Sequence, residues 1–220
     1  MKLELARSAG FCYGVKRAVE MAEQAARAGG AVLLGPVIHN DHVVAQLEEE
    51  GAVLVHTVEE VPPGAAVILR SHGEARRVHE ALAEKGCRIV DTACPNVQRI
   101  HRLVAEAEAA GRQPPDHPEI VAIAGWCTHP VVLPDGAALA AWLSEEPGRR
   151  EMPITMVSQT TSTRGIWEFA LETAKKECTN AEIFDTICNA TYIRQSEAQK
   201  LAAHCDAMIV IGDRTSSNTR

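Results

Sequence analysis

The sequence predicts an α/β protein built from three related units, the third of them incomplete. Three cysteines, Cys12, Cys94 and Cys188, recur 82 and 94 residues apart, and an Ala- and Glu-rich stretch follows each of them. These stretches cover residues 15–26, 97–110 and 194–203. Their apolar residues recur at i, i+3 and i+4, which indicates amphipathic helices. Short apolar runs alternate with the helices, and this alternation is typical of parallel sheets.

The apolar runs predict where the strands of each unit lie. They cover residues 31–34 and 66–69 in the first unit, 154–157 in the second and 207–211 in the third. The second unit lacks a run after its first helix, because Gln113-Pro-Pro-Asp116 stands there and consecutive prolines cannot form a central strand. In the third unit, the counterpart of the second run would fall beyond residue 220. We therefore expect units at 1–94, with an N-terminal strand, at 95–188, and an incomplete unit at 189–220.

Composition excludes some classes of partner. The formal net charge of −7 argues against a nucleic-acid binder, whose binding face is usually basic. No apolar stretch is long enough to cross a membrane, and the N-terminus has no apolar core of a signal peptide. We expect neither nucleic acid nor a membrane as a partner, and the cytoplasm as the compartment. In that reducing compartment, seven cysteines favour metal binding or catalysis over disulfides.

The three repeated cysteines are candidate metal ligands. Each stands at the start of a predicted helix, where the dipole favours anions and lowers the pKa of a thiol. One thiolate from each unit, meeting at a central point, can bind an iron–sulfur cluster, or zinc with a fourth ligand. A four-iron cluster with three protein ligands would keep one iron open for a substrate. The other cysteines lack this placement and are interpreted as packing or surface thiols: Cys87, Cys127, Cys178 and Cys205.

Polar loops at predicted strand ends supply further candidates. His39, His72 and His117 lie in such loops, where imidazoles can contact phosphate oxygens or bind zinc. Uncharged donors in the third loop suit phosphate better than a metal: Ser216, Ser217 and Asn218. Glu119 follows His117 by two residues, so both would point the same way from an extended segment. Negative neighbours would raise its pKa and let it donate a proton, although a solvated loop carboxylate explains Glu119 as well.

Taken together, these motifs resemble the 4-hydroxy-3-methylbut-2-enyl diphosphate reductase family from Ala6 to Arg220. The segments that carry the resemblance are Gly10–Ala18, Ile38–Asn40, Ser71–Gly73, Asp91–Pro95, His117–Glu119, Ser158–Thr161, Cys188–Thr191 with Arg194 and Gln195, and Ser216–Asn218. Each segment alone is weakly specific. Their occurrence together, in the order found in the family, is highly specific.

The resemblance implies an activity and a role for each matching residue. The activity is reductive dehydroxylation of (E)-4-hydroxy-3-methylbut-2-enyl diphosphate to isopentenyl and dimethylallyl diphosphate, the last step of the methylerythritol phosphate route to isoprenoids. Cys12, Cys94 and Cys188 would hold a [4Fe-4S] cluster that receives electrons from ferredoxin or flavodoxin. Glu119 would deliver a proton, and Thr160 or Thr161 would lie beside the alcohol of the substrate. The remaining substrate-binding residues would mostly hold the diphosphate: His39, His72, His117, Ser216, Ser217 and Asn218.

Two departures from the family pattern keep alternatives open. The strand before His117 is missing, and the family continues beyond Arg220 with the rest of the third unit. One alternative is an inactive truncated remnant that at most binds diphosphates. Another is a zinc hydrolase that uses His39, His72 and His117, which stoichiometric zinc without sulfide would favour.

Overall fold

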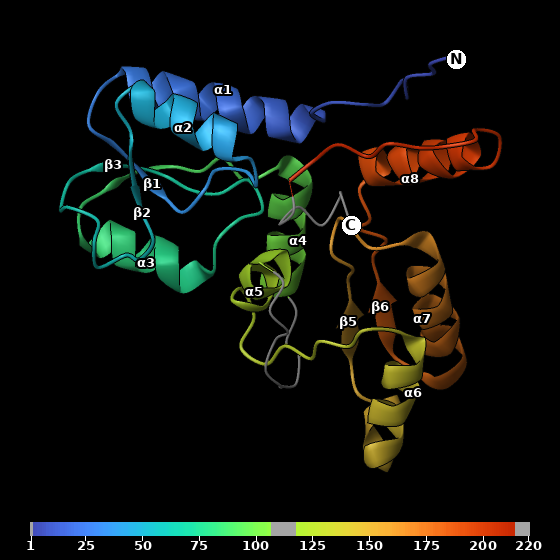
Figure 1. The fold of residues 1–220 in the computed structure, drawn as a ribbon. Coiled ribbons are helices and arrows are strands. Elements are labelled where there is room, and N and C mark those ends of the chain that lie inside the picture. Colours follow the sequence, from blue (N-terminus) through green and yellow to red (C-terminus); the bar gives the residue numbers. More distant parts are fainter. Residues whose placement is uncertain (1, 107–117, 214–220) are drawn as a thin grey trace. The chain divides into compact units, whose positions relative to one another are not determined.

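The computed structural model describes residues 2–106 and 118–213, and the chain folds into two compact units. Unit 1 comprises residues 1–73, 77–95 and 189–220, and unit 2 comprises residues 74–76 and 96–188. Figure 1 follows the chain through both units by colour. The predicted division into three units stays a prediction.

Unit 1 is organised around a parallel sheet of four strands in the order β2-β1-β3-β4. The strands are β1 (Ala31–Leu34), β2 (Val53–Val55), β3 (Ala66–Ile68) and β4 (Arg88–Val90). Leu33 of β1 pairs with Leu54 on one side and with Ile68 on the other. All four residues of β1 are buried, as a central strand covered on both faces requires. The strand predicted at 31–34 and the parallel sheet are confirmed.

Helices cover both faces of this sheet (Figure 1). The helices of unit 1 are α1 (Tyr13–Arg27), α2 (Asp41–Glu49), α3 (Arg76–Glu84) and α8 (Asn189–Ala202). Successive side chains of a strand point to opposite faces. Ala31 and Leu33 therefore join the core formed with α1 and α2, whereas Val32 and Leu34 join the core that includes Leu82 of α3. The continuous apolar run of β1 thus contributes side chains to the hydrophobic cores on both faces of the sheet.

Unit 2 has a smaller sheet. Its helices are α4 (Pro95–Glu106), α5 (Pro118–Ala124), α6 (Gly136–Glu145), the 3-10 helix η1 (Pro147–Arg150) and α7 (Arg164–Glu177), and its strands are β5 (Ile154–Met156) and β6 (Ala181–Ile183). The two strands pair in parallel, and Ile154 and Met156 pack with Leu143 of α6 and Ala174 of α7. The strand predicted at 154–157 is confirmed. Within the described part of unit 2, the sheet consists of β5 and β6 alone.

Two predicted strands do not form in the described residues. The N-terminal segment 2–6 and the segment 207–211 have no strand conformation. Ile209 and Ile211 are 86% and 93% exposed, so the prediction of a buried strand at 207–211 is wrong. A strand needs a neighbour that pairs with its backbone groups, and neither segment has such a neighbour among the described residues.

Every helix in the described ranges is too short or too polar to cross a membrane.

Candidate active site

The three repeated cysteines each lie directly before a helix. Cys12 precedes α1, Cys94 precedes α4 and Cys188 precedes α8, as the sequence predicted. The first backbone N–H groups of a helix have no partner within the helix, and they make its N-terminus a favourable place for an anion. Cys12 is the N-cap of α1, and its side chain forms no capping hydrogen bond.

The thiols of Cys12 and Cys94 both border Gly14 in unit 1. A Cβ atom at Gly14 would lie 2.6 Å from Sγ of Cys94 and 3.9 Å from Sγ of Cys12. A carbon–sulfur distance of 2.6 Å is far inside van der Waals contact, so only glycine fits between these sulfurs. The guanidinium of Arg17 on α1 also donates a hydrogen bond to the carbonyl of Ala93, at 3.2 Å. This hydrogen bond therefore joins helix α1 to the segment that ends in Cys94.

Two predicted histidines lie close together at the carboxyl edge of the unit 1 sheet. The rings of His39 and His72 stack with 5.5 Å between centroids and 14° between planes. The N–H of Ser71 donates to the carbonyl of Val37 at 2.9 Å, which joins the loop after β3 to the loop after β1. The N–H of Cys94 in turn donates to the carbonyl of Ser71 at 3.0 Å. One hydrogen-bonded region of unit 1 thus contains a candidate ligand and two candidate diphosphate-binding residues.

Glu119 is a buried acid in unit 2. It is 3% exposed and stands in the first turn of α5, so the extended segment and the solvated loop carboxylate considered for it are both wrong. Thr160 donates two hydrogen bonds to its carboxylate, from the backbone N–H at 2.6 Å and from the hydroxyl at 3.0 Å. Burial raises the pKa of Glu119 to about 6, against the lowering effect of these two bonds. The raised pKa was predicted, but its principal cause is loss of water and not neighbouring charge.

Hydrogen bonds link Cys188 to this acid. The N–H of Cys188 donates to the carbonyl of Thr160 at 2.9 Å, and the side-chain amide of Asn96 donates to Sγ of Cys188 at 3.3 Å. Of the two threonines left open by the sequence, Thr160 is the one that contacts Glu119. The hydroxyl of Thr161 is buried and has no hydrogen-bond partner within the described ranges, so it can contact a ligand.

The structure brings the predicted site residues together within each unit. Cys12, Cys94, His39 and His72 belong to unit 1, whereas Cys188, Glu119 and Thr160 belong to unit 2. The remaining predicted residues lie outside the described ranges: His117, Ser216, Ser217 and Asn218. A role for Asn96 was not predicted from the sequence. Its place two residues after Cys94, in the first turn of α4, could have indicated that its side chain lies near a candidate ligand.

The sequence matches the LytB protein family over residues 3–220. The chain belongs to this family. It is 35% identical over 227 residues to the 4-hydroxy-3-methylbut-2-enyl diphosphate reductase of Clostridioides difficile, with 100% of this chain and 80% of the relative covered. It is 36% identical over 234 residues to the enzyme of the same name from Caldanaerobacter subterraneus, with 100% and 78% covered. The chain thus spans about four fifths of the length of these LytB relatives.

Solved structures of similar proteins agree with this membership. One is (E)-4-hydroxy-3-methyl-but-2-enyl diphosphate reductase, the terminal enzyme of the non-mevalonate pathway, with a TM-score of 0.72 and 31% identity over 99% of this chain and 79% of that one. Another is the E-1-hydroxy-2-methyl-but-2-enyl-4-diphosphate reductase of Plasmodium falciparum, with a TM-score of 0.80 and 26% identity over 96% and 68%. Both LytB-like structures support the α/β fold with parallel strands.

A zinc site built from His39, His72 and His117 stays a prediction, because His117 lies outside the described residues. Within residues 2–106 and 118–213, three potential metal ligands come within 4.8 Å of one another at Glu4, His204 and Cys205. This group includes none of the residues that the sequence predicted as metal ligands.

Proposed function

We propose that the chain reduces (E)-4-hydroxy-3-methylbut-2-enyl diphosphate to isopentenyl and dimethylallyl diphosphate. The observation that carries this proposal is the buried Glu119, whose carboxylate is bonded to Thr160 beside Cys188. It supplies a proton donor next to a candidate cluster ligand. The names of the LytB relatives support the same activity.

Cys12, Cys94 and Cys188 are the residues proposed to hold a [4Fe-4S] cluster. Gly14 supports this assignment, because a larger residue would exclude the sulfurs that border it. In unit 2, the side-chain amide of Asn96 donates a hydrogen bond to Sγ of Cys188, and hydrogen bonds of this kind are found at the sulfurs of iron–sulfur clusters. When bound, the cluster supplies single electrons and a Lewis-acidic iron.

Glu119 and Thr160 are proposed to move the proton of the reaction. A pKa of about 6 keeps part of the Glu119 population protonated near neutral pH. The hydroxyl of Thr160 lies 3.0 Å from the carboxylate, so a proton can pass between these two groups. Protonation of the leaving hydroxyl would turn it into water, a better leaving group.

The diphosphate end of the substrate is proposed to bind at His39 and His72. Their stacked rings lie at the carboxyl edge of a parallel sheet, where ligands of such sheets bind. Hydrogen bonds from imidazolium to phosphate oxygens are charge-assisted and therefore strong. The proposal extends to four residues outside the described ranges: His117, Ser216, Ser217 and Asn218.

The partners and the compartment are also proposals. Ferredoxin or flavodoxin would deliver the electrons, and the cytoplasm would be the compartment.

Anaerobic reconstitution of the 220-residue chain tests the proposed function. We expect a brown protein with about four irons and matching sulfide per chain. With dithionite as reductant, it should convert the substrate to both products. A colourless protein would contradict the proposed [4Fe-4S] cluster. A protein that contains iron and binds the substrate without converting it would support the alternative of an inactive truncated remnant.

His72→Phe should weaken diphosphate binding. Phenylalanine keeps an aromatic ring but has no ring nitrogens. We expect KM to rise about tenfold with kcat little changed, because one hydrogen bond to a charged group is lost. The matched control is His56→Phe at an exposed position. Steady-state kinetics at saturating reductant would measure both constants, and an unchanged KM would remove His72 from the diphosphate site.

Asn96→Leu should lower the reduction potential of the cluster. A hydrogen bond from an amide to a ligating sulfur stabilises the reduced, more negative cluster, and leucine removes the donor at similar volume. Redox titration followed by electron paramagnetic resonance measures the shift. Equal iron content in both proteins serves as the control, and equal potentials would show that Asn96 does not tune the site.

A further inference from the structure

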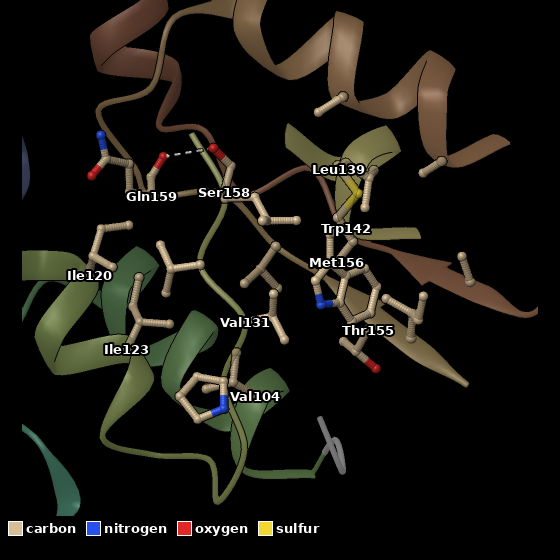
Figure 2. Close-up of a pocket in the computed structure, with 18 of the residues that line it drawn as sticks. Val104, Ile120, Ile123, Val131, Leu139, Trp142, Thr155, Met156, Ser158 and Gln159 are labelled. Carbon is tan, nitrogen blue, oxygen red and sulfur yellow. Dashed lines mark hydrogen bonds between the residues drawn. The ribbon is translucent and has the colours of Figure 1, made fainter. Parts of the chain in front are cut away.

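Unit 2 contains a cavity of about 830 Å³ with a largely apolar lining. Figure 2 shows Val104 of α4, Ile123 of α5, Trp142 of α6 and Met156 of β5 around it. Such a lining favours apolar groups over ions, because a buried charge is costly without polar partners. Within residues 2–106 and 118–213, potential metal ligands come together in unit 1 instead.

The group in unit 1 consists of Glu4, His204 and Cys205. One carboxylate oxygen, one imidazole nitrogen and the thiol sulfur all lie within 4.8 Å of one another. Nε2 of His204 lies 3.5 Å from Oε2 of Glu4. Two ligands of a tetrahedral zinc ion are about 3.3–3.6 Å apart, since each lies about 2.0–2.3 Å from the metal. The imidazole and the carboxylate are thus at the spacing of two zinc ligands, and the thiol of Cys205 needs to move by at most about 1 Å.

A hydrogen bond on the other ring nitrogen orients His204 for metal binding. Nδ1 of His204 lies 2.6 Å from the carbonyl oxygen of Lys200. A carbonyl can only accept a hydrogen bond, so Nδ1 carries the ring proton. In the neutral imidazole the lone pair is then on Nε2, the atom that lies beside Glu4. Histidines that bind metals typically donate their second ring nitrogen to a carbonyl or a carboxylate in this way.

The N-terminal segment of unit 1 follows one face of α8. Arg194, near the start of this helix, donates to the carbonyls of Ser8 and Gly10 at 3.0 and 2.7 Å. The carboxylate of Glu197, about one turn further along, accepts from the N–H groups of Arg7 and Ser8 at 2.7 and 2.8 Å. The segment and the helix therefore run side by side in opposite directions (Figure 1).

This arrangement brings Glu4 to the C-terminal end of α8. His204 follows Glu197 by seven residues, which is about two helical turns, so both lie on the same face. The N–H groups of His204 and Cys205 donate to the carbonyl of Leu201 at 3.2 and 3.0 Å, which fixes the two adjacent residues beside the last carbonyls of the helix. The C-terminal end of a helix carries a partial negative charge, and this charge favours a bound cation.

We propose that Glu4, His204 and Cys205 bind a zinc ion that holds the N-terminal segment against the C-terminal end of α8. Thiolate and imidazole ligands suit zinc, whereas magnesium and calcium prefer oxygen. Three protein ligands leave the fourth tetrahedral position for water. Without a metal, His204 and Glu4 form an ion pair whose side chains are 55% and 46% exposed, and such a pair contributes little to stability. The proposal does not depend on the reductase activity, because none of these residues belongs to the proposed active site.

Alkylation of individual cysteines tests this zinc site, because it reports on Cys205 separately from the other thiols. The reduced 220-residue chain is treated with iodoacetamide, with and without zinc, and the labelled peptides are quantified by mass spectrometry. Zinc should slow the alkylation of Cys205 at least about tenfold, since the thiolate that would react is bound to the metal. Cys87, another partly exposed thiol of unit 1, is the matched control and should react equally with and without zinc. Magnesium at the same concentration should protect neither thiol.

Substitution of the other two ligands tests whether they belong to the same site. Glu4→Gln and His204→Gln should each remove most of the zinc protection of Cys205, because glutamine lacks the charge of the carboxylate and the ring nitrogen of histidine. His56→Gln, at an exposed position, should keep the protection. An unchanged alkylation rate of Cys87 verifies that unit 1 is folded in each variant. If zinc does not protect Cys205 in the wild type, or if protection persists undiminished in Glu4→Gln or in His204→Gln, the proposal is wrong.

Discussion

Gly14→Ala is expected to abolish cluster assembly, with iron falling from about four per chain to background after anaerobic reconstitution. The added Cβ would lie 2.6 Å from Cys94 Sγ, so this sulfur or helix α1 would have to move. Alanine is the better helix former, and helix propensity alone therefore predicts a slightly more stable protein. Loss of iron from a folded variant would separate the steric effect on the sulfurs from any effect on the helix.

Gly165→Ala is a closely matched control for this experiment. Gly165 is the second residue of α7, as Gly14 is the second residue of α1, and a Cβ there would meet nothing within 4 Å. This variant should load iron normally. Cys94→Ser should lose iron as Gly14→Ala does, because serine is a poor ligand for iron–sulfur clusters. Normal iron content in Gly14→Ala would contradict the placement of the Cys12 and Cys94 ligands around this glycine.

Glu119→Gln is expected to lower kcat by two to four orders of magnitude, roughly the contribution of a general acid. Glutamine keeps the shape of the side chain and can still accept the hydrogen bond from the N–H of Thr160, but it cannot deliver a proton. Iron content and KM should change little. Turnover assays with dithionite measure the loss, and a variant that retains full activity would exclude Glu119 as the proton donor.

The same substitution should change how stability depends on pH. Folding raises the pKa of Glu119 from 4.5 to about 6, so the folded state binds this proton more tightly than the unfolded state does. Its contribution to stability is fully present below pH 4.5 and is lost as the pH rises through about 6. Glutamine does not ionise. Relative to wild type, Glu119→Gln should therefore gain up to about 2 kcal/mol in the free energy of unfolding between pH 4.5 and pH 8.

Urea unfolding at pH 5 and pH 8 measures this difference. Glu182→Gln, at an exposed position of β6, should follow the pH dependence of the wild type. If the free energy of unfolding changes equally with pH in Glu119→Gln and in the wild type, folding does not raise the pKa of Glu119.

The sequence alone determined the elements that depend on local signals. The helices that begin after Cys12, Cys94 and Cys188 were predicted from their periodicity, and each is present. The strand at 31–34 was predicted from four consecutive apolar residues, and it lies at the centre of a parallel sheet. Periodicity and apolar runs depend on residues near one another in the chain, so these features can be predicted without knowledge of the packing.

Only the tertiary structure decided which groups lose water and which find partners. The burial of Glu119 and its two bonds to Thr160 join residues 41 positions apart, and the bond from Asn96 to Cys188 joins residues 92 positions apart. The segment 207–211 has the composition of a buried strand, yet it is exposed because no described neighbour pairs with it. Burial and strand pairing depend on which residues pack against a segment, and residues adjacent in the chain do not determine that packing.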